Sequence, residues 1–337
     1  MNNSAGIILK IYSALRHIPG VKALVKLVFR PKKSPLISRE LFGLHFSNPI
    51  GLASGMDTNG DFIREINDFG FGFIEIGPLT NEAQDARHYP QLVHFFKEKA
   101  ILSSSDYANK GVKHAIEALG EKKSEALIAA NIIPGRNAQK EDDIAKDIRI
   151  SFTYLYDFVD FFVVNISSPN EEGQITVRDE FEVADIVTPL LDIRLCYGEY
   201  RPILLKISTD FSKKLIDSIL DYCMMNGVDG IVVGGHTTDR SSLAKFSRRK
   251  LDLIPKGRIS GAPLYEKTLE TVKYINDQTK GRFPIVACGG IISPAQALKM
   301  LQSGASLIEY NTALHYNGPG LIKKTVKCLL SEFSNRQ

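Results

Sequence analysis

The sequence predicts an α/β protein: a (β/α)8 TIM barrel that follows a helical extension at its N-terminus. From residue 42 onward, eight short apolar segments rich in Ile and Val alternate with segments of helical periodicity. Near-continuous apolar strands between helices are typical of a parallel sheet that is buried on both faces. Eight such units over about 290 residues fit this barrel, whereas the alternative, a doubly wound open sheet, usually has fewer strands.

The repeating units can be placed along the chain. The expected strands are 49–54, 71–77, 127–131, 161–166, 203–207, 230–234, 285–289 and 307–311. The expected helices are 61–69, 143–155, 181–195, 212–225, 265–278, 294–302 and 320–333. The gaps after the second and the sixth strand are about fifty residues long, where a bare βα unit needs about 30 residues. Both gaps should therefore carry insertions, the first around 103–107 and the second around 258–263.

Residues 1–40 differ from the rest of the chain, and we expect them to form a basic amphipathic extension to a barrel domain of residues 41–337. The extension has a net charge of +7, although the whole chain has only +4. Apolar side chains recur at helical spacing over residues 7–15 and again over 24–29. The sequence therefore predicts two short helices, each with an apolar face.

Two interpretations of these helices remain open. They could lie on a membrane surface, apolar face down, with the stripe formed by Lys22, Lys26 and Arg30 on the lipid phosphates. They could instead dock on the chain's own barrel and leave their cations in solvent.

Composition excludes several other classes of protein. The overall charge is too small for a general nucleic-acid binder, and no apolar run is long enough to span a bilayer. The four cysteines are scattered and form no C-x-x-C pair, so we expect neither a disulfide framework nor a metal site. These features indicate a cytoplasmic protein, and the membrane-surface interpretation of the extension would put it on the inner face of the cell membrane.

Small or polar residues follow the expected strands, and the ends of parallel strands in a barrel converge on one face. The glycines and polar residues after the last two strands, Gly289, Gly290, Asn311 and Thr312, suit a phosphate site or, alternatively, a tight turn. Lys206 ends an apolar strand, so it either faces an anionic cofactor or extends to solvent at the rim. His236 could act as an acid or base, or could be structural.

Together these motifs resemble the dihydroorotate dehydrogenase family, and specifically its quinone-linked class 2. The resemblance runs from about Asn48 to the C-terminus. It is carried by residues 48–55, 70–77, 165–170, 259–264 and 289–291. Class 1 members have a cysteine where this chain has Ser168, and they lack the N-terminal extension, so both features favour class 2.

The resemblance implies an FMN enzyme of pyrimidine biosynthesis that oxidises dihydroorotate and passes the electrons to a quinone. Ser168 would take a proton from C5 of the substrate while a hydride leaves C6 for the flavin, and Lys206 would stabilise the reduced flavin. The implied flavin contacts are Ser54, Gly55, Asn131, Asn165, Lys206, Gly261, Gly289, Gly290, Asn311 and Thr312. The implied substrate contacts are Asn165, Asn170, Gly235 and His236. Residues 1–40 would form the membrane-facing entrance for the quinone.

The chain departs from the family pattern mainly at substrate contacts. Family members usually carry a lysine within the segment 57–60, Thr at Pro78, Asn-Arg-Met-Gly-Phe at 103–107 and Thr-Asn-Thr at 234–236. Their Tyr-Ser-Gly phosphate segment reads Asn311-Thr312-Ala313 here. His236 and Arg136 could compensate for the lost contacts. Otherwise the alternatives are an FMN oxidoreductase of a different, less anionic substrate, or a catalytically inactive flavin-binding homologue.

Overall fold

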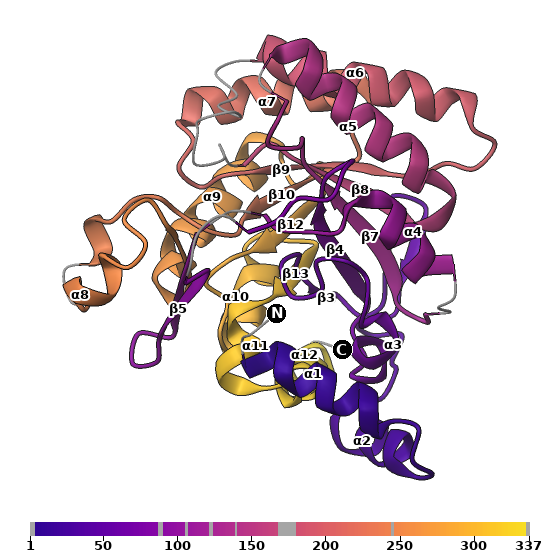
Figure 1. Ribbon diagram of the computed structural model, residues 1–337, viewed down its shortest axis with the longest axis vertical. Helices are drawn as coiled ribbons and strands as arrows, with labels where there is room; N and C mark the ends of the chain where they lie inside the picture. The colour runs from indigo at the N-terminus through magenta and orange to yellow at the C-terminus, as the bar shows by residue number, and fades with distance from the viewer. Residues whose placement is uncertain are drawn as a thin grey trace.

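A computed structural model of the chain describes residues 4–86, 90–104, 107–120, 124–138, 140–167, 180–243 and 246–334. Its centre is a closed barrel of eight parallel strands, which lie in chain order around the ring (Figure 1). The strands are β3 (Ile50–Leu52), β4 (Phe73–Leu79), β7 (Leu127–Ile132), β8 (Phe161–Asn165), β9 (Ile203–Ile207), β10 (Gly230–Gly234), β12 (Ile285–Cys288) and β13 (Leu307–Tyr310). The last strand pairs with the first and closes the barrel. The predicted fold class is confirmed.

Helices surround the barrel, because each strand buries one face in the barrel and the other face against a helix. The helices are α3 (Ile63–Asp68), α4 (Gly111–Gly120), α5 (Glu141–Leu155), α6 (Glu180–Cys196), α7 (Lys213–Asn226), α9 (Tyr265–Gln278), α10 (Pro294–Gln302) and α12 (Gly320–Ser334). The seven expected helices are present. The sequence analysis missed α4 and the short helix α11 (Thr312–Asn317).

One end of the barrel is filled by aromatic side chains. A hairpin of β1 (Arg39–Leu41) and β2 (Leu44–Phe46) brings Phe46 against Phe73 and Phe161, with ring centroids 5.6 and 6.0 Å away. Phe73 and Phe161 begin their strands, so this plug lies at the N-terminal end of the sheet. The polar strand ends are therefore at the opposite, open end, which is called the mouth below.

The two predicted insertions meet in space, which the sequence did not indicate. β5 (Leu92–Phe95) and β6 (Ala100–Ser103) come from the first insertion, and β11 (Arg258–Gly261) comes from the second. They form one antiparallel sheet in the order β11-β6-β5. Ile259 packs with Leu102 and Val93 in a small apolar core of their own. The remainder of the second insertion holds the short helix α8 (Arg248–Leu251).

The N-terminal extension forms two helices, α1 (Ser4–Leu15) and α2 (Val21–Phe29), which lie beside α3, α11 and α12 at the lower edge of Figure 1. Leu9 and Tyr12 are buried against the barrel domain. The Tyr12 hydroxyl donates to Asp68 at 2.8 Å. Within the predicted apolar segment 7–15, Tyr12 therefore faces the barrel, where its hydroxyl finds a buried acceptor.

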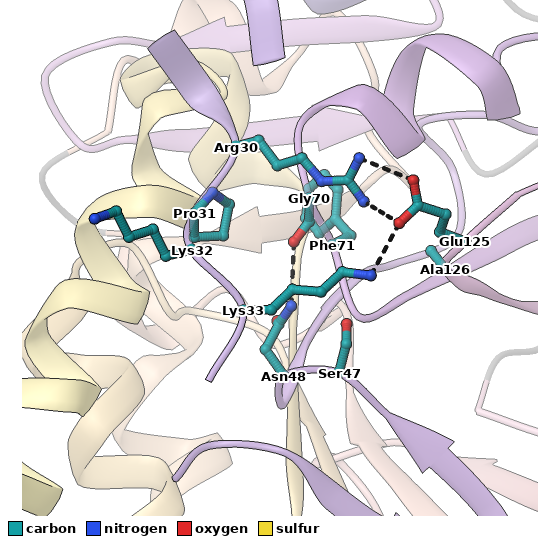
Figure 2. A pocket seen from close by; sticks show the side chains of 10 residues that line it. All are labelled: Arg30, Pro31, Lys32, Lys33, Ser47, Asn48, Gly70, Phe71, Glu125 and Ala126. Atoms are coloured by element: carbon teal, nitrogen blue, oxygen red, sulfur yellow. Dashed lines mark hydrogen bonds and ion pairs between the residues drawn. The ribbon is translucent and has the colours of Figure 1, made fainter. Parts of the chain in front are cut away.

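Charges hold the extension in place. Asp68 also forms ion pairs with Arg16 at 3.1 Å and with Lys26 at 3.4 Å. Beyond α2, both Arg30 and Lys33 bind Glu125, at 2.7 and 3.0 Å, at the edge of a small pocket (Figure 2). Two cations of the predicted stripe, Lys26 and Arg30, thus bind barrel carboxylates and do not face outward towards lipid phosphates.

The linker after α2 packs closely on the barrel in the same place. Gly70 has a φ of +85°, and a Cβ there would lie 2.6 Å from the ring of Pro31. The carbonyl of Gly70 accepts a hydrogen bond from the amide of Asn48 at 3.1 Å (Figure 2). Only a glycine allows both this left-handed backbone and this close approach.

Most of the predicted apolar face of the extension points outward. The exposed apolar residues are Ile7, Ile8, Ile11, Leu15, Ile18, Leu24, Leu27 and Val28. Within the described part of the chain, no helix is both long enough and apolar enough to cross a bilayer.

Candidate active site

Lys206 lies inside the mouth of the barrel, surrounded by acidic groups. Lys206 is only 4% exposed. Its Nζ lies 2.8 Å from Glu75 Oε1 on β4 and 3.9 Å from Glu309 Oε2 on β13. It also donates to the Ser54 hydroxyl at 3.4 Å. The lysine therefore does not extend to solvent at the rim, and it holds a fixed positive charge at the ends of three strands.

Lys206, Glu75 and Glu309 cannot all be ionised with their charges in balance, because one ammonium faces two carboxyls. Burial alone would raise the pKa of Glu75, but the Lys206 charge, with a smaller contribution from the neighbouring Glu309 carboxyl, outweighs it, so the pKa is lowered. Burial and the charge on Glu75 raise the pKa of Glu309 well above its usual value. Burial alone would lower the pKa of Lys206, but the acidic groups Cys288, Glu75 and Glu309 raise it. The charges of Glu75 and Lys206 therefore support each other, and Glu309 is the acid of the cluster whose ionisation is disfavoured.

A line of hydrogen bonds leads from this cluster to the end of β8. The Asn131 amide donates to Glu75 at 2.6 Å. The Asn165 amide donates to Asn131 at 3.2 Å, and the Ser167 hydroxyl donates to Asn165 at 2.6 Å. The structure thus brings Asn131, Asn165 and Lys206 together, as predicted. Ser168 and Asn170 lie outside the described residues.

A pocket lined with glycine opens beside Lys206, with a volume of about 300 Å³. Its lining includes the predicted Gly235, Gly261, Gly289, Gly290, Asn311 and Thr312. The Asn311 amide donates to the carbonyl of Ser54 at 2.6 Å, and a Cβ on Gly55 would lie 3.1 Å from that amide. The Thr312 hydroxyl bonds the Ser260 hydroxyl at 2.8 Å. The phosphate residues and the flavin-ring residues predicted from the sequence are therefore neighbours.

The donors at this pocket fit FMN. Glycine backbone and the Thr312 hydroxyl suit a phosphate, and the two asparagine amides and the Lys206 ammonium suit the polar edge of a flavin ring. Glu309 Oε2 is buried without a hydrogen-bond partner within the described part of the chain. It lines this pocket, so a bound group could satisfy it.

The second insertion contributes Arg258, which contacts His236 and which the sequence analysis did not select. Its Nη1 lies 2.9 Å from His236 Nε2 and also donates to the Tyr107 hydroxyl. Burial and the charges of Arg258 and Lys206 hold the pKa of His236 well below its usual value, so the imidazole is neutral. Had β11 been predicted, the alternation of side chains along a strand would have indicated that Arg258 projects to the face opposite the buried Ile259. Arg136, in contrast, donates to the carbonyl of Asp85 at 3.0 Å.

A second, apolar cavity of about 410 Å³ lies between the extension and the barrel. Its lining is formed by Ile8, Leu9, Leu52, Met56, Ile66, Phe69, Phe71, Leu314 and Pro319. Leu52 ends β3, two residues before Ser54. The cavity therefore runs from α1 towards the strand ends that also border the Lys206 cluster.

Comparisons with known proteins agree with this arrangement. A family model described as dihydroorotate dehydrogenase matches residues 36–333. A dihydroorotate dehydrogenase (quinone) of Christiangramia forsetii is 32% identical over 307 residues, which cover 91% of this chain and 88% of the relative. One of Thermosynechococcus vestitus is 34% identical over 307 residues, covering 88% of this chain and 82% of the relative. The solved structure of DHODH in complex with ferulenol from Eimeria tenella has a TM-score of 0.83 at 25% identity and covers 97% of this chain and 95% of its own.

Proposed function

This chain belongs to the dihydroorotate dehydrogenase family, in its quinone-linked class 2, and on that premise we propose that it oxidises dihydroorotate to orotate with FMN as cofactor and a quinone as electron acceptor. It is an oxidoreductase. The observation that carries the proposal is the buried Lys206, held beside a glycine-lined pocket by two strand-borne carboxyls.

The residues around the pocket divide into two groups. The backbone at Gly261, Gly289 and Gly290, with Asn311 and Thr312, would hold the FMN phosphate. Asn131, Asn165 and Lys206 would hold the ring at its polar edge. When bound, FMN supplies the acceptor for the hydride that leaves C6 of dihydroorotate.

Proton removal is the task of the loop after β8. Ser168 would take the proton from C5, and Asn165 and Asn170 would bind the pyrimidine ring. The hydrogen bonds that link Glu75, Asn131, Asn165 and Ser167 fix the start of this loop. We propose that an ordered start would help a base in this loop to reach C5 and so would lower the entropic cost of the reaction.

The quinone would enter through the apolar cavity below α1. Its lining is hydrocarbon and aromatic, which suits an isoprenoid quinone. The outward apolar residues of α1 and α2 continue from this cavity onto the surface, and the exposed Lys10 and Lys22 flank them. We therefore propose that residues 1–40 rest on the inner face of the cell membrane and admit quinone from the lipid.

One assay tests the reaction. Purified protein with bound FMN is mixed with dihydroorotate, and orotate is measured with a ubiquinone analogue, fumarate or NAD⁺ as acceptor. We expect orotate only with the quinone. Flavin that is reduced by dithionite but never by dihydroorotate would instead support an FMN oxidoreductase of another substrate or an inactive homologue.

A single substitution tests the base. Ser168→Ala should slow flavin reduction by dihydroorotate by about 10²-fold or more, the usual cost of losing a general base. FMN content should not change. Unchanged reduction would remove Ser168 from this role and leave His236 as the candidate.

A further inference from the structure

We propose that Arg258, together with His236 and Tyr107, binds the carboxylate of the substrate at the mouth of the barrel. The inference rests on the proposed function and deepens it, because it names the cation that recognises the anionic group. The residue comes from β11 in the second insertion, outside the strand ends of the barrel.

Backbone pairing fixes where Arg258 points. β11 pairs with β6, with Arg258 opposite Ser103. On its other side, Ile259 and Thr237 exchange two backbone hydrogen bonds of 2.9 Å each. Side chains alternate along a strand, so Arg258 and Ser260 project to the face opposite the buried Ile259. Ser260 on that face bonds Thr312, which lines the glycine pocket, so Arg258 also faces the mouth.

Arg258 is a buried cation whose neighbours are neutral. It is only 4% exposed, and it forms no ion pair with any residue that the structure describes. A second buried arginine, Arg194, is 8% exposed and binds Asp229 at 2.7 Å. A buried charge without a counterion is costly. A ligand anion that supplies the missing negative charge explains why the chain keeps an arginine there.

The hydrogen bonds of the Arg258 guanidinium use one of its three nitrogens and leave Nε and Nη2 available. Nη1 donates to the neutral His236 ring and to the Tyr107 hydroxyl. Neither Nε nor Nη2 donates to an acceptor in the described ranges. Tyr107 has φ +48°, a left-handed conformation that is rare for an aromatic residue and is typical of functional sites. Nε and Nη2 can therefore donate together to the two oxygens of a carboxylate, which is the geometry that arginine forms best.

The cluster adjoins the proposed chemistry. His236 follows Gly235, and a Cβ on Gly235 would lie 3.8 Å from Cε of Lys206. A ring bound over Lys206 could therefore extend its carboxylate to Arg258. The sequence analysis left this compensating role to His236 and Arg136. The inference replaces Arg136 with Arg258, beside His236, in a chain that lacks the lysine usual in the segment 57–60.

A binding titration tests the inference on the holoenzyme. Orotate is added and the absorbance change of bound FMN is followed. Arg258→Met should raise the Kd for orotate by about 10²-fold or more, the usual cost of losing a buried charge-assisted pair. Arg258→Lys should lie between that variant and the wild type. The control Arg249→Met makes the same change at an exposed position of the same insertion and should bind like the wild type.

Replacing the ligand carboxylate separates this role from a structural one. Orotamide carries a neutral amide in place of the carboxylate. The wild type should bind orotamide far more weakly than orotate, whereas Arg258→Met should bind the two almost equally, with unchanged FMN content. A variant that still prefers orotate as strongly as the wild type does would overturn the inference alone. A wild type that binds no orotate would overturn the proposed function as well. If Arg258→Met does not fold, Arg258→Lys decides by the same comparison.

Discussion

The mouth and the docked extension each contain a cluster of buried charges, and the two clusters are built differently. In the mouth, the single cation Lys206 faces two carboxyls, Glu75 and Glu309. Under the extension, the cations Arg16 and Lys26 face two carboxyls, Asp68 and Glu65. The second cluster is balanced and holds two helices in place. The first cluster has one acid too many, which is typical of a site that binds a charged partner.

The difference assigns distinct tasks to the two regions. Arg16 and Lys26 of the extension are paired with carboxylates of the barrel, whereas most of its apolar residues are exposed. One of these exposed residues, Ile8, also lines the apolar cavity. The unbalanced cluster in the mouth keeps Lys206 charged and in place beside the glycine pocket. Chemistry and quinone entry should therefore respond separately to substitution, and four variants test this from the largest expected effect to the smallest.

Removing the cation of the mouth should have the largest effect. Lys206→Met leaves the Glu75 carboxylate buried without its cation, which costs about 3–5 kcal/mol of unfolding free energy. It should also abolish dihydroorotate oxidation. Urea unfolding and the orotate assay measure the two losses. The double variant Lys206→Met/Glu75→Gln should regain part of the stability but none of the activity, because it removes the unpaired charge without restoring the cation.

A lysine at the surface serves as the control that shows whether burial causes the loss of stability in Lys206→Met. Lys267, whose side chain is 38% exposed, pairs with Asp210 at the surface. Lys267→Met should cost no more than about 1 kcal/mol. Equal losses at Lys206 and Lys267 would contradict the claim that the mouth cluster is special.

Weakening the balanced cluster should loosen the extension and leave the mouth intact. Asp68→Asn disturbs contacts to Tyr12, Arg16 and Lys26 together, and should destabilise the docked helices by about 1–3 kcal/mol. Hydrogen exchange of α1 and α2 should rise while FMN content stays constant. Asp252→Asn, at an exposed position, is the control. Loss of FMN from the Asp68 variant would show that the two regions are not separable.

The extra acid of the mouth should make stability depend on pH. The pKa of Glu309 is raised in the folded protein, so the folded state keeps a proton that the unfolded chain releases above pH 4.5. Stability from this group is present below pH 4.5 and decreases as pH rises towards the folded pKa. Glu309→Gln keeps the size of the side chain and removes this penalty. The variant should gain about 1 kcal/mol or more over the wild type at pH 8, and much less at pH 4.5, in urea unfolding at both pH values.

The smallest effect should come from the exposed ion pairs of the linker. Hydrogen bonds from Arg30 and Lys33 lower the pKa of Glu125 to about 2. The stability that they provide is present above pH 4.5 and is lost as pH falls towards 2. Half of the Glu125 side chain is exposed to solvent, so Glu125→Gln should cost only about 0.2–1 kcal/mol at pH 7. A loss in thermal unfolding that exceeds the loss in Asp68→Asn would mean that the linker contributes more to docking than Asp68 does.

The sequence predicted the barrel because its signal is local: each buried strand is an apolar run that ends in a small or polar residue. It did not predict the sheet of β5, β6 and β11, because Ala100 and Gly261 pair across 160 intervening residues with no turn between them. The ion pairs of the extension were missed for the same reason, since Asp68 and Glu125 lie far along the chain from their partners.

The site was predicted only in part. Glycines and asparagines at strand ends were identified correctly as neighbours, because the geometry of a parallel barrel brings strand ends together. Glu75 and Glu309 were overlooked, although a charged residue inside an apolar strand is itself a signal. Whether Glu309 is ionised depends on its distance from Lys206 and on burial, and neither quantity can be read from one sequence.

The separation of the two tasks is tested most directly by measuring the two half-reactions in variants of α1. Ile8 lines the apolar cavity and its neighbour Ile7 does not, yet both are about half exposed, at 50% and 49%. In rapid mixing, Ile8→Trp should slow reoxidation of the reduced protein by a long-chain quinone by about tenfold or more, and should leave flavin reduction by dihydroorotate unchanged. Ile7→Trp should leave both rates unchanged. Equal quinone rates in the two variants, or a slower dihydroorotate step in Ile8→Trp alone, would contradict the account.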